Sequence, residues 1–181
     1  MTLITGGHPA ARAEGAARLD ASDLAMMRRA IDLAQRAAAE GEVPVGAVVY
    51  RGAEILGEGY NLREGRCDPT AHAEIIAMRR AADKIGEWRL SGCSLAVTLE
   101  PCPMCAGAIV NARIDRVLFG PTDPKAGAVE TLFRLCSDER LNHRVEIIGN
   151  VLAPQCRTLL RDFFKERRKA NRAARQVPTA E

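Results

Sequence analysis

The feature that most constrains the fold of this chain is a pair of short motifs, His-Ala-Glu and Pro-Cys-Pro-Met-Cys, which lie far apart in the sequence. A catalytic zinc ion has three protein ligands and one position open to water, whereas a structural zinc ion has four protein ligands. His72, Cys102 and Cys105 would supply three ligands, so the fold must bring the two motifs side by side. Glu74 stands two residues from the histidine, close enough to reach a metal-bound water. The pattern predicts a hydrolytic zinc centre with Glu74 as its general acid/base.

Two other kinds of site contain a Cys-x-x-Cys pair, namely redox centres and zinc ribbons. A redox pair does not need an upstream His-x-Glu, and a ribbon needs a second pair of ligands. The other two histidines, His8 and His143, have no ligand spacing to another candidate, which favours the catalytic site. The remaining cysteines are isolated, and we expect small buried or half-buried thiols at Cys67, Cys93, Cys136 and Cys156.

Length and composition indicate one ordinary globular domain. The chain has 181 residues, of which 47% are hydrophobic and 27% are charged. No apolar run is long enough to cross a membrane, and the N-terminus has no hydrophobic signal core, so we expect a cytoplasmic protein with no membrane partner. The net charge of +3 and the pI of 8.6 fall short of the strongly basic balance that alone indicates nucleic-acid binding.

The two ends of the chain differ in composition from its centre. Residues 1–19 are rich in Ala, Gly and Arg and have no apolar period, so we expect a disordered leader. Residues 20–170 form the predicted zinc-binding catalytic domain. Residues 171–181 are expected to form a frayed basic tail.

Hydrophobic periodicity and turn residues predict strands that alternate with helices after an opening hairpin. This order favours an α/β fold with a mixed five-stranded sheet and helices on both faces. The two motif-bearing helices follow the second and third strands, so both begin at the same end of the sheet. The expected strands are 45–50, 54–60, 94–99, 116–119 and 145–151, and the expected helices are 20–40, 70–84, 101–111, 129–135 and 154–170.

Two further features have more than one interpretation from the residues alone. Asn61 lies just past a predicted strand, where it could be a turn residue or a residue of the site. The last predicted helix is basic, which fits a solvated face as well as contact with phosphates. Phe163 and Phe164 belong to its apolar stripe, and we expect one ring in the core and the other free to stack on a base.

The two motifs together resemble the signature of the zinc nucleobase deaminases, of the cytidine/deoxycytidylate deaminase superfamily. The resemblance extends from about Leu24 to Arg168 and is strongest with the bacterial tRNA adenosine deaminases. The matching segments are 41–47, 68–74 and 98–108, with more specific matches at 119–120, Asp123, 125–128, 141–146, 163–164 and 167–168. It implies a three-layer α/β/α cytidine-deaminase-like fold and one zinc ion per subunit.

The resemblance also implies roles for residues outside the zinc motif. The substrate would be a tRNA anticodon stem-loop, whose wobble adenosine is converted to inosine, and the enzyme would be a homodimer. Asn61 would hydrogen-bond the flipped nucleotide and Val43 would line its pocket. Neighbouring nucleotides of the anticodon loop and nearby phosphates would be contacted by Glu42, Asp123, Lys125, Asn142, Phe164, Arg167 and Arg168.

Three functions are therefore weighed. The first is hydrolytic deamination of the wobble adenosine of a tRNA, and the second is deamination of a free base or nucleoside such as guanine or cytosine. The third is a non-catalytic, zinc-stabilised RNA-binding module. Glu74 argues against the third function, because a structural zinc site does not need an acid that binds no metal. The basic helix and the loop around Asp123 argue against the second.

Overall fold

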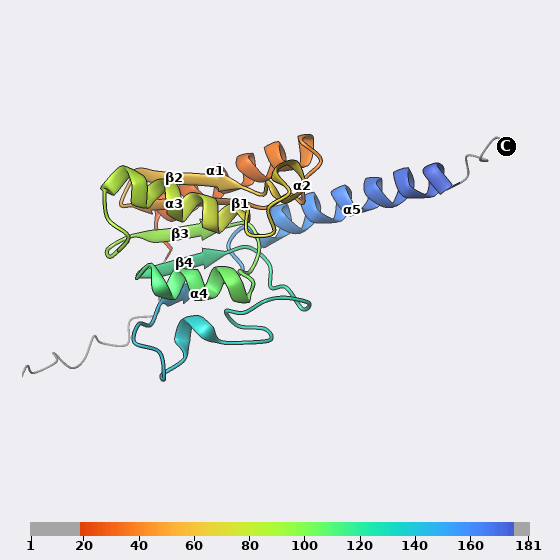
Figure 1. The fold of residues 1–181 in the computed structure, drawn as a ribbon. Helices are drawn as coiled ribbons and strands as arrows, with labels where there is room; N and C mark the ends of the chain where they lie inside the picture. Colours follow the sequence, from red (N-terminus) through yellow and green to blue (C-terminus); the bar gives the residue numbers. More distant parts are fainter. Residues whose placement is uncertain (1–18, 176–181) are drawn as a thin grey trace, which may run out of the picture.

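A computed structural model describes residues 19–175 of the chain (Figure 1). The predicted leader, apart from Leu19, lies outside the described residues, as do residues 176–181 of the predicted tail. The described chain contains the following elements: α1 (Ala21–Ala39), β1 (Gly46–Arg51), β2 (Glu54–Tyr60), α2 (Arg63–Arg66), α3 (Ala73–Ile85), β3 (Ser94–Val97), α4 (Pro103–Asn111), β4 (Arg116–Phe119), η1 (Leu135–Ser137), β5 (Glu146–Ile148) and α5 (Ala153–Arg175).

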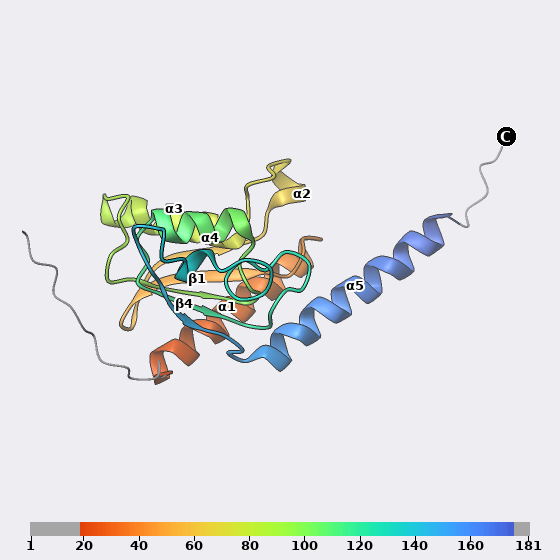
Figure 2. The same ribbon diagram turned by 90° about the horizontal axis from the view of Figure 1, so that it is seen from below.

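The five strands form one mixed sheet in the order β2-β1-β3-β4-β5. β1 runs antiparallel to both of its neighbours, and β3, β4 and β5 run parallel to one another. Helices α3 and α4 cover one face of the sheet, while α1 and the start of α5 lie on the other (Figure 2). This arrangement confirms the predicted three-layer α/β/α fold with a mixed five-stranded sheet.

Glycines on β2 allow α3 to lie unusually close to the sheet. A Cβ atom at Gly59 would collide with the carbonyl oxygen of Ala73, and one at Gly57 would collide with that of Ala77. The start of α3, where His72 and Glu74 lie, is therefore held against the strand by direct backbone contact. Position 59 tolerates no larger residue without displacement of the predicted site.

The helix that carries His72 begins later than the sequence predicts. The carboxylate of Asp68 accepts bonds from the backbone N–H (2.8 Å) and the hydroxyl (2.6 Å) of Thr70, which hold the chain before the helix in a tight turn. His72 is the N-cap of α3, and Cys102 is likewise the N-cap of α4. Two ligand candidates thus precede the first turns of these helices rather than lie within them.

Other boundaries also differ from prediction. The helix expected at 129–135 is absent from the described chain; turns lead there to the 3-10 helix η1 (Leu135–Ser137). The short helix α2 was not predicted, and β5 is shorter than the expected strand at 145–151. Helix α5 continues to Arg175, beyond its expected end near residue 170. Within residues 19–175, no helix combines the length and the apolar composition needed to span a membrane.

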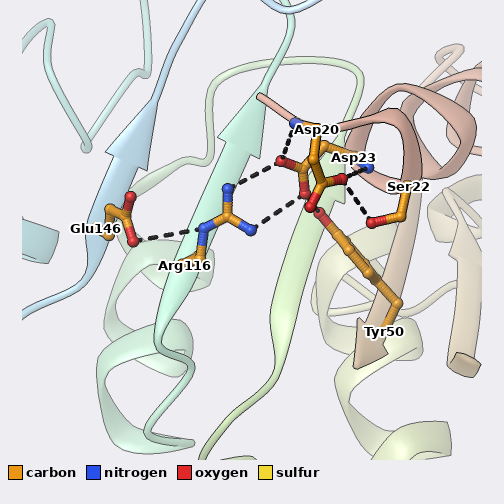
Figure 3. Close-up of polar contacts among 6 residues, drawn as sticks. All are labelled: Asp20, Ser22, Asp23, Tyr50, Arg116 and Glu146. Atoms are coloured by element: carbon orange, nitrogen blue, oxygen red, sulfur yellow. Dashed lines mark hydrogen bonds and ion pairs between the residues drawn. The ribbon is translucent and has the colours of Figure 1, made fainter. Parts of the chain in front are cut away.

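A polar network closes one end of the sheet (Figure 3). The fully buried Asp23 accepts a 2.5 Å hydrogen bond from the hydroxyl of Tyr50 and two bonds, of 3.1 and 2.9 Å, from Arg116. Arg116 also lies 3.4 Å from the carboxylate of Glu146. Burial raises the pKa of Asp23, but the hydrogen bonds from Arg116 and Tyr50 outweigh it, so the pKa lies below its ordinary value. This network is satisfied entirely by the chain's own groups.

Candidate active site

The two motifs meet at the opposite end of the sheet from that network. β2 and β3 run in the same direction, because each is antiparallel to β1, so their carboxyl ends lie at one edge. Helices α3 and α4 both start at this edge (Figure 1). The topology predicted from the sequence is therefore the reason that His72 and the cysteine pair are neighbours.

The three ligand candidates form a compact cluster. The Nδ1 atom of His72 lies 3.6 Å from the Sγ atom of Cys102 and 3.6 Å from that of Cys105. A tetrahedral zinc ion with Zn–N near 2.0–2.1 Å and Zn–S near 2.3 Å would separate nitrogen and sulfur by about 3.6 Å. The three ligand atoms all lie within 4.8 Å of one another. The cluster can hold a metal ion, and its spacing and donor set fit zinc.

The cluster favours the thiolate form, which binds metal, at one of its two cysteines, Cys102. The hydrogen bond from Cys105, with further help from His72, lowers the pKa of Cys102 to about 4. The same interaction, together with burial, raises the pKa of Cys105. The bond to Cys102 raises the pKa of His72. Since Cys102 also occupies the N-cap position of α4, the partial positive charge of the helix end adds to its preference for negative charge.

Glu74 lies in the first turn of α3, beside the cluster, and is 4% exposed. Burial raises the pKa of its carboxyl, and the negative charge of Cys102 raises it further. The carboxyl of Glu74 therefore lies close enough to Cys102 for the two groups to interact, and a cation bound at the cluster would favour the ionised form of both. A carboxyl with a raised pKa that does not bind the metal is suited to move protons near neutral pH.

Asn61 is neither a simple turn residue nor a freely exposed side chain. It is buried; its amide nitrogen donates to the carbonyl of Val43 (3.2 Å) and its oxygen accepts from the backbone N–H of Ala73 (3.0 Å). The side chain therefore links the start of α3 to the segment before β1. Its second amide N–H keeps a donor for a substrate.

Val43 forms part of the wall of a pocket of about 410 Å³. The pocket brings together four residues that the sequence predicts for substrate contact, namely Val43, Asp123, Lys125 and Phe164. Leu99 and Leu160 add apolar surface, and Arg157 adds a positive charge. Phe164 is 41% exposed and Phe163 is half-buried. The prediction that one of these two rings lies in the core is therefore wrong.

Glu100 is a residue of the site that sequence analysis did not identify. Its buried carboxylate accepts hydrogen bonds from the backbone N–H groups of Asp123 (2.9 Å), Glu130 (2.8 Å) and Thr131 (2.9 Å), and from that of Val129 (3.2 Å). The hydroxyl of Thr131 also donates to it. These bonds fix the turns that the chain forms where the sequence predicts a helix at 129–135. An acidic residue at the end of an apolar strand was the signal available in the sequence.

Glu100 links the candidate metal ligands to the pocket. It stands two residues before Cys102 in the chain, and its carboxylate holds the loop that carries Asp123 by a hydrogen bond. Burial raises its pKa, but the bonds from Thr131 and from backbone N–H groups outweigh that effect and leave the pKa below its ordinary value. A Cβ atom at Gly127 would collide with the Glu100 carboxylate, so the loop passes directly over it. The carboxylate is thus ionised and fully engaged in holding the loop.

The remaining predicted contact residues lie elsewhere. The buried Glu42 accepts a 2.8 Å bond from the backbone N–H of Gly65 in α2. Asn142 is bonded to Arg113 (2.7 Å), just past the end of α4, about 15 Å along that helix from Cys102. Arg167 lies 3.9 Å from Glu64 in α2, and Arg168 is exposed. One copy of the chain therefore does not bring Asn142 into the pocket.

The chain is similar to known deaminases over most of its length. The family described as MafB19-like deaminase matches residues 21–168. A Bacillus subtilis protein named tRNA-specific adenosine deaminase is 47% identical over 150 residues, which cover 83% of this chain and 93% of that protein. A Haemophilus influenzae protein of the same name is 50% identical over 148 residues, which cover 81% of this chain and 86% of the relative.

Solved structures agree with this assignment. A structure from work on A-to-I editing by tRNA deaminases at the wobble position of transfer RNA has a TM-score of 0.73 and 38% identity, and the match covers 75% of this chain and 99% of that one. A guanine deaminase from Bacillus subtilis has a TM-score of 0.52 and 32% identity, with coverage of 60% and 80%. From this site and these similarities, we conclude that the chain belongs to the tRNA-specific adenosine deaminase family, within the MafB19-like deaminases.

Proposed function

We propose that this protein is a zinc-dependent deaminase that converts adenosine to inosine at the wobble position of a tRNA anticodon. The observation that carries the proposal is the His72, Cys102 and Cys105 cluster with the buried Glu74 beside it. Hydrogen bonds of Asn61 and Glu100 link the segments that carry this cluster to Val43 and Asp123, which line the pocket. Relatives that share 47% and 50% identity are named tRNA-specific adenosine deaminase. The anticodon loop suits such a site because its bases are unpaired and can leave the stack.

His72, Cys102 and Cys105 would hold one zinc ion per subunit. Zinc with three protein ligands supplies an activated water as nucleophile. In hydrolytic deamination, oxygen from water bonds to C6 of adenine, the bond from C6 to the amino nitrogen breaks, and ammonia leaves. Glu74 would take the proton from the attacking water and deliver it to the departing amine. Its raised pKa supports both halves of this task.

The pocket would hold the loop nucleotides around the target base. Val43 and Leu99 offer apolar surface, and the exposed ring of Phe164 is available for stacking on a base. Asn61 would use its second amide N–H toward the target nucleotide. Lys125, Arg167 and Arg168 would meet phosphates, and Asp123 and Glu42 would contact bases or the backbone.

We further propose that the protein acts as a homodimer in the cytoplasm. An apolar groove between α3 and α4, lined by Ile75, Met78, Ala108 and Ala112 and by the 57% exposed Trp88, is a surface that a second copy could cover. Dimer formation would also allow Asn142 to act at a site from which it is distant within one chain. Sedimentation at several concentrations tests this state, and a monomer at micromolar concentration would contradict it.

The experiment that tests the proposed function is incubation of the purified protein with an anticodon stem-loop that carries a wobble adenosine. Inosine is scored by mass spectrometry, with free guanine, cytosine and cytidine as parallel substrates. We expect inosine from the stem-loop and no product from the free bases or from cytidine. Turnover of guanine alone would favour the free-base deaminase, and binding of the stem-loop without any product would favour the non-catalytic module.

A further inference from the structure

One face of α5 carries a continuous stripe of positive charge. Arg157, Arg161, Lys165, Arg168 and Arg172 follow one another at intervals of three or four residues. At 3.6 residues per turn they fall within an arc of about 80° around the helix axis. All five side chains are exposed. We call this set the α5 stripe.

The rest of the helix surface has a different character. Cys156 is buried and Leu159 and Phe163 are half-buried, and these three lie on the opposite side of the helix from the stripe. The acidic residues Asp162 and Glu166 lie between the two sides, outside the arc. The start of α5 is therefore anchored to the body by its apolar side, and the stripe lies on the other side of the helix, with only its first member, Arg157, in the wall of the pocket.

The stripe begins at the pocket and leads away from the body. Arg157 lines the pocket, and α5 leaves the body at the edge toward which the β3 and β4 arrows point (Figure 1). Both views show the later part of α5 extending beyond the domain (Figure 2). From Arg157 to Arg172 the stripe is about 22 Å long, far longer than one nucleotide needs. It also continues past residue 168, where the family match ends.

Little within the described chain neutralises the stripe. In the part of the chain that the structure describes, Arg161 is the one member with an ion-pair partner, the neighbouring Asp162 at 2.9 Å. Like charges at helix spacings of three and four residues repel one another and disfavour the helix. A solvated helix face normally mixes charges of both signs, whereas a partner with regularly spaced negative charge would offset the repulsion.

We propose that the α5 stripe binds the phosphate backbone of the double-stranded stem that carries the target loop. The inference rests on the proposed function, because the stem is placed by the loop that enters the pocket. Arg157 would lie near the loop, and Lys165 and Arg172 would meet stem phosphates progressively farther from the target base. Contacts of this kind position an RNA without reading its sequence, so the stripe would add affinity for any stem.

The test compares two RNAs that share one loop and differ in stem length: a full stem, and the shortest stem that keeps the loop closed. The variant Lys165→Gln with Arg172→Gln removes two charges, and glutamine preserves helix propensity. The control Arg28→Gln with Lys84→Gln removes the same charge from exposed sites on α1 and α3. Equal melting temperatures show that both variants are folded. The measurement is the affinity of each protein for each RNA across a salt series.

On the full stem, we expect the slope of log affinity against log salt concentration to be smaller in magnitude by about 2 for the α5 variant than for the wild type. Each of the two lost phosphate contacts should lower the slope by about 0.9. The control should match the wild type, and the short stem should not distinguish the three proteins. Equal slopes on the full stem would overturn the proposal, as would an equal loss on both RNAs, which would place the contacts on the loop. Inosine formation by the wild type on the short stem tests the proposed function separately, because it does not depend on the stripe.

Discussion

The two ends of the sheet each hold a cluster of ionisable groups, and the clusters are built in opposite ways. At one end, the buried Asp23 receives three hydrogen bonds from Tyr50 and Arg116, and its pKa falls (Figure 3). At the other end, Glu74 lies beside the cluster of His72, Cys102 and Cys105, and burial together with the charge of Cys102 raises its pKa. At the first end every buried polar side-chain atom has a partner within the described chain, whereas the second brings together three candidate metal ligands and a buried acid whose pKa is raised. The first is therefore expected to govern stability, and the second catalysis.

The largest expected effect is on metal content. Cys102→Ser replaces a thiolate whose pKa is about 4 with a hydroxyl that stays protonated, so the variant should lose its zinc and all deaminase activity. Cys67 is exposed, so the expectation of a buried or half-buried thiol is wrong there. Cys67→Ser is therefore the matched control and should keep both zinc and activity. Elemental analysis of the purified proteins checks this, and zinc at one ion per chain in Cys102→Ser would refute the ligand assignment.

Glu74→Gln should separate metal binding from catalysis. The amide is nearly the same size but cannot carry the proton, so we expect unchanged zinc content and a fall in kcat of about 10²- to 10⁴-fold. Glu54→Gln, at an exposed position on β2, should retain full activity. Single-turnover assays with a stem-loop measure the difference. Activity in Glu74→Gln comparable with that of the wild type would remove Glu74 from the mechanism.

Asp23→Asn should have the reverse effect, a loss of stability with normal turnover by the folded protein. The change leaves Arg116 without its buried partner, and we expect unfolding to cost about 3 kcal/mol less at neutral pH. Because the pKa of Asp23 is lower in the folded state, its stabilisation is complete above the unfolded pKa near 3.9 and is lost as the pH falls through the folded value.

Denaturant unfolding at pH 7 and at acid pH checks this sign. The difference between the wild type and Asp23→Asn should shrink as the pH falls below about 4. The exposed Asp83→Asn should show no such difference at either pH. A loss of turnover in folded Asp23→Asn, at unchanged zinc content, would contradict the division of roles between the two ends of the sheet.

Glu100→Gln should have a smaller and more local effect. An amide oxygen cannot accept all the bonds that the carboxylate accepts, so the loop from Asp123 to Thr131 should open more readily, at a cost of about 1–3 kcal/mol. Hydrogen exchange at the backbone amides of residues 123–131 should speed up, and stem-loop affinity should fall, while zinc is retained. The exposed Glu139→Gln is the control. Unchanged exchange in this loop would show that Glu100 does not hold it.

The sequence predicted the parts of this molecule that depend on local patterns. The clustering of His72, Cys102 and Cys105, the alternation of strands and helices and the mixed sheet follow from residue spacing, and the shared edge of β2 and β3 follows from topology. The loop after Asp123 could not be predicted because its bonds to Glu100 join residues 23 to 31 positions apart. The link from Asn61 to Val43 and Ala73 was missed for the same reason, since its partners lie 18 and 12 positions away.

The measurement that tests the central claim most directly is deamination in water enriched in heavy oxygen. The protein is incubated with an anticodon stem-loop that carries a wobble adenosine, and the recovered nucleoside is analysed by mass spectrometry. The proposed hydrolysis predicts inosine with one heavy oxygen, in the wild type and not in Glu74→Gln. Unchanged adenosine after incubation with the zinc-loaded wild type, or inosine that carries only light oxygen, would contradict the account.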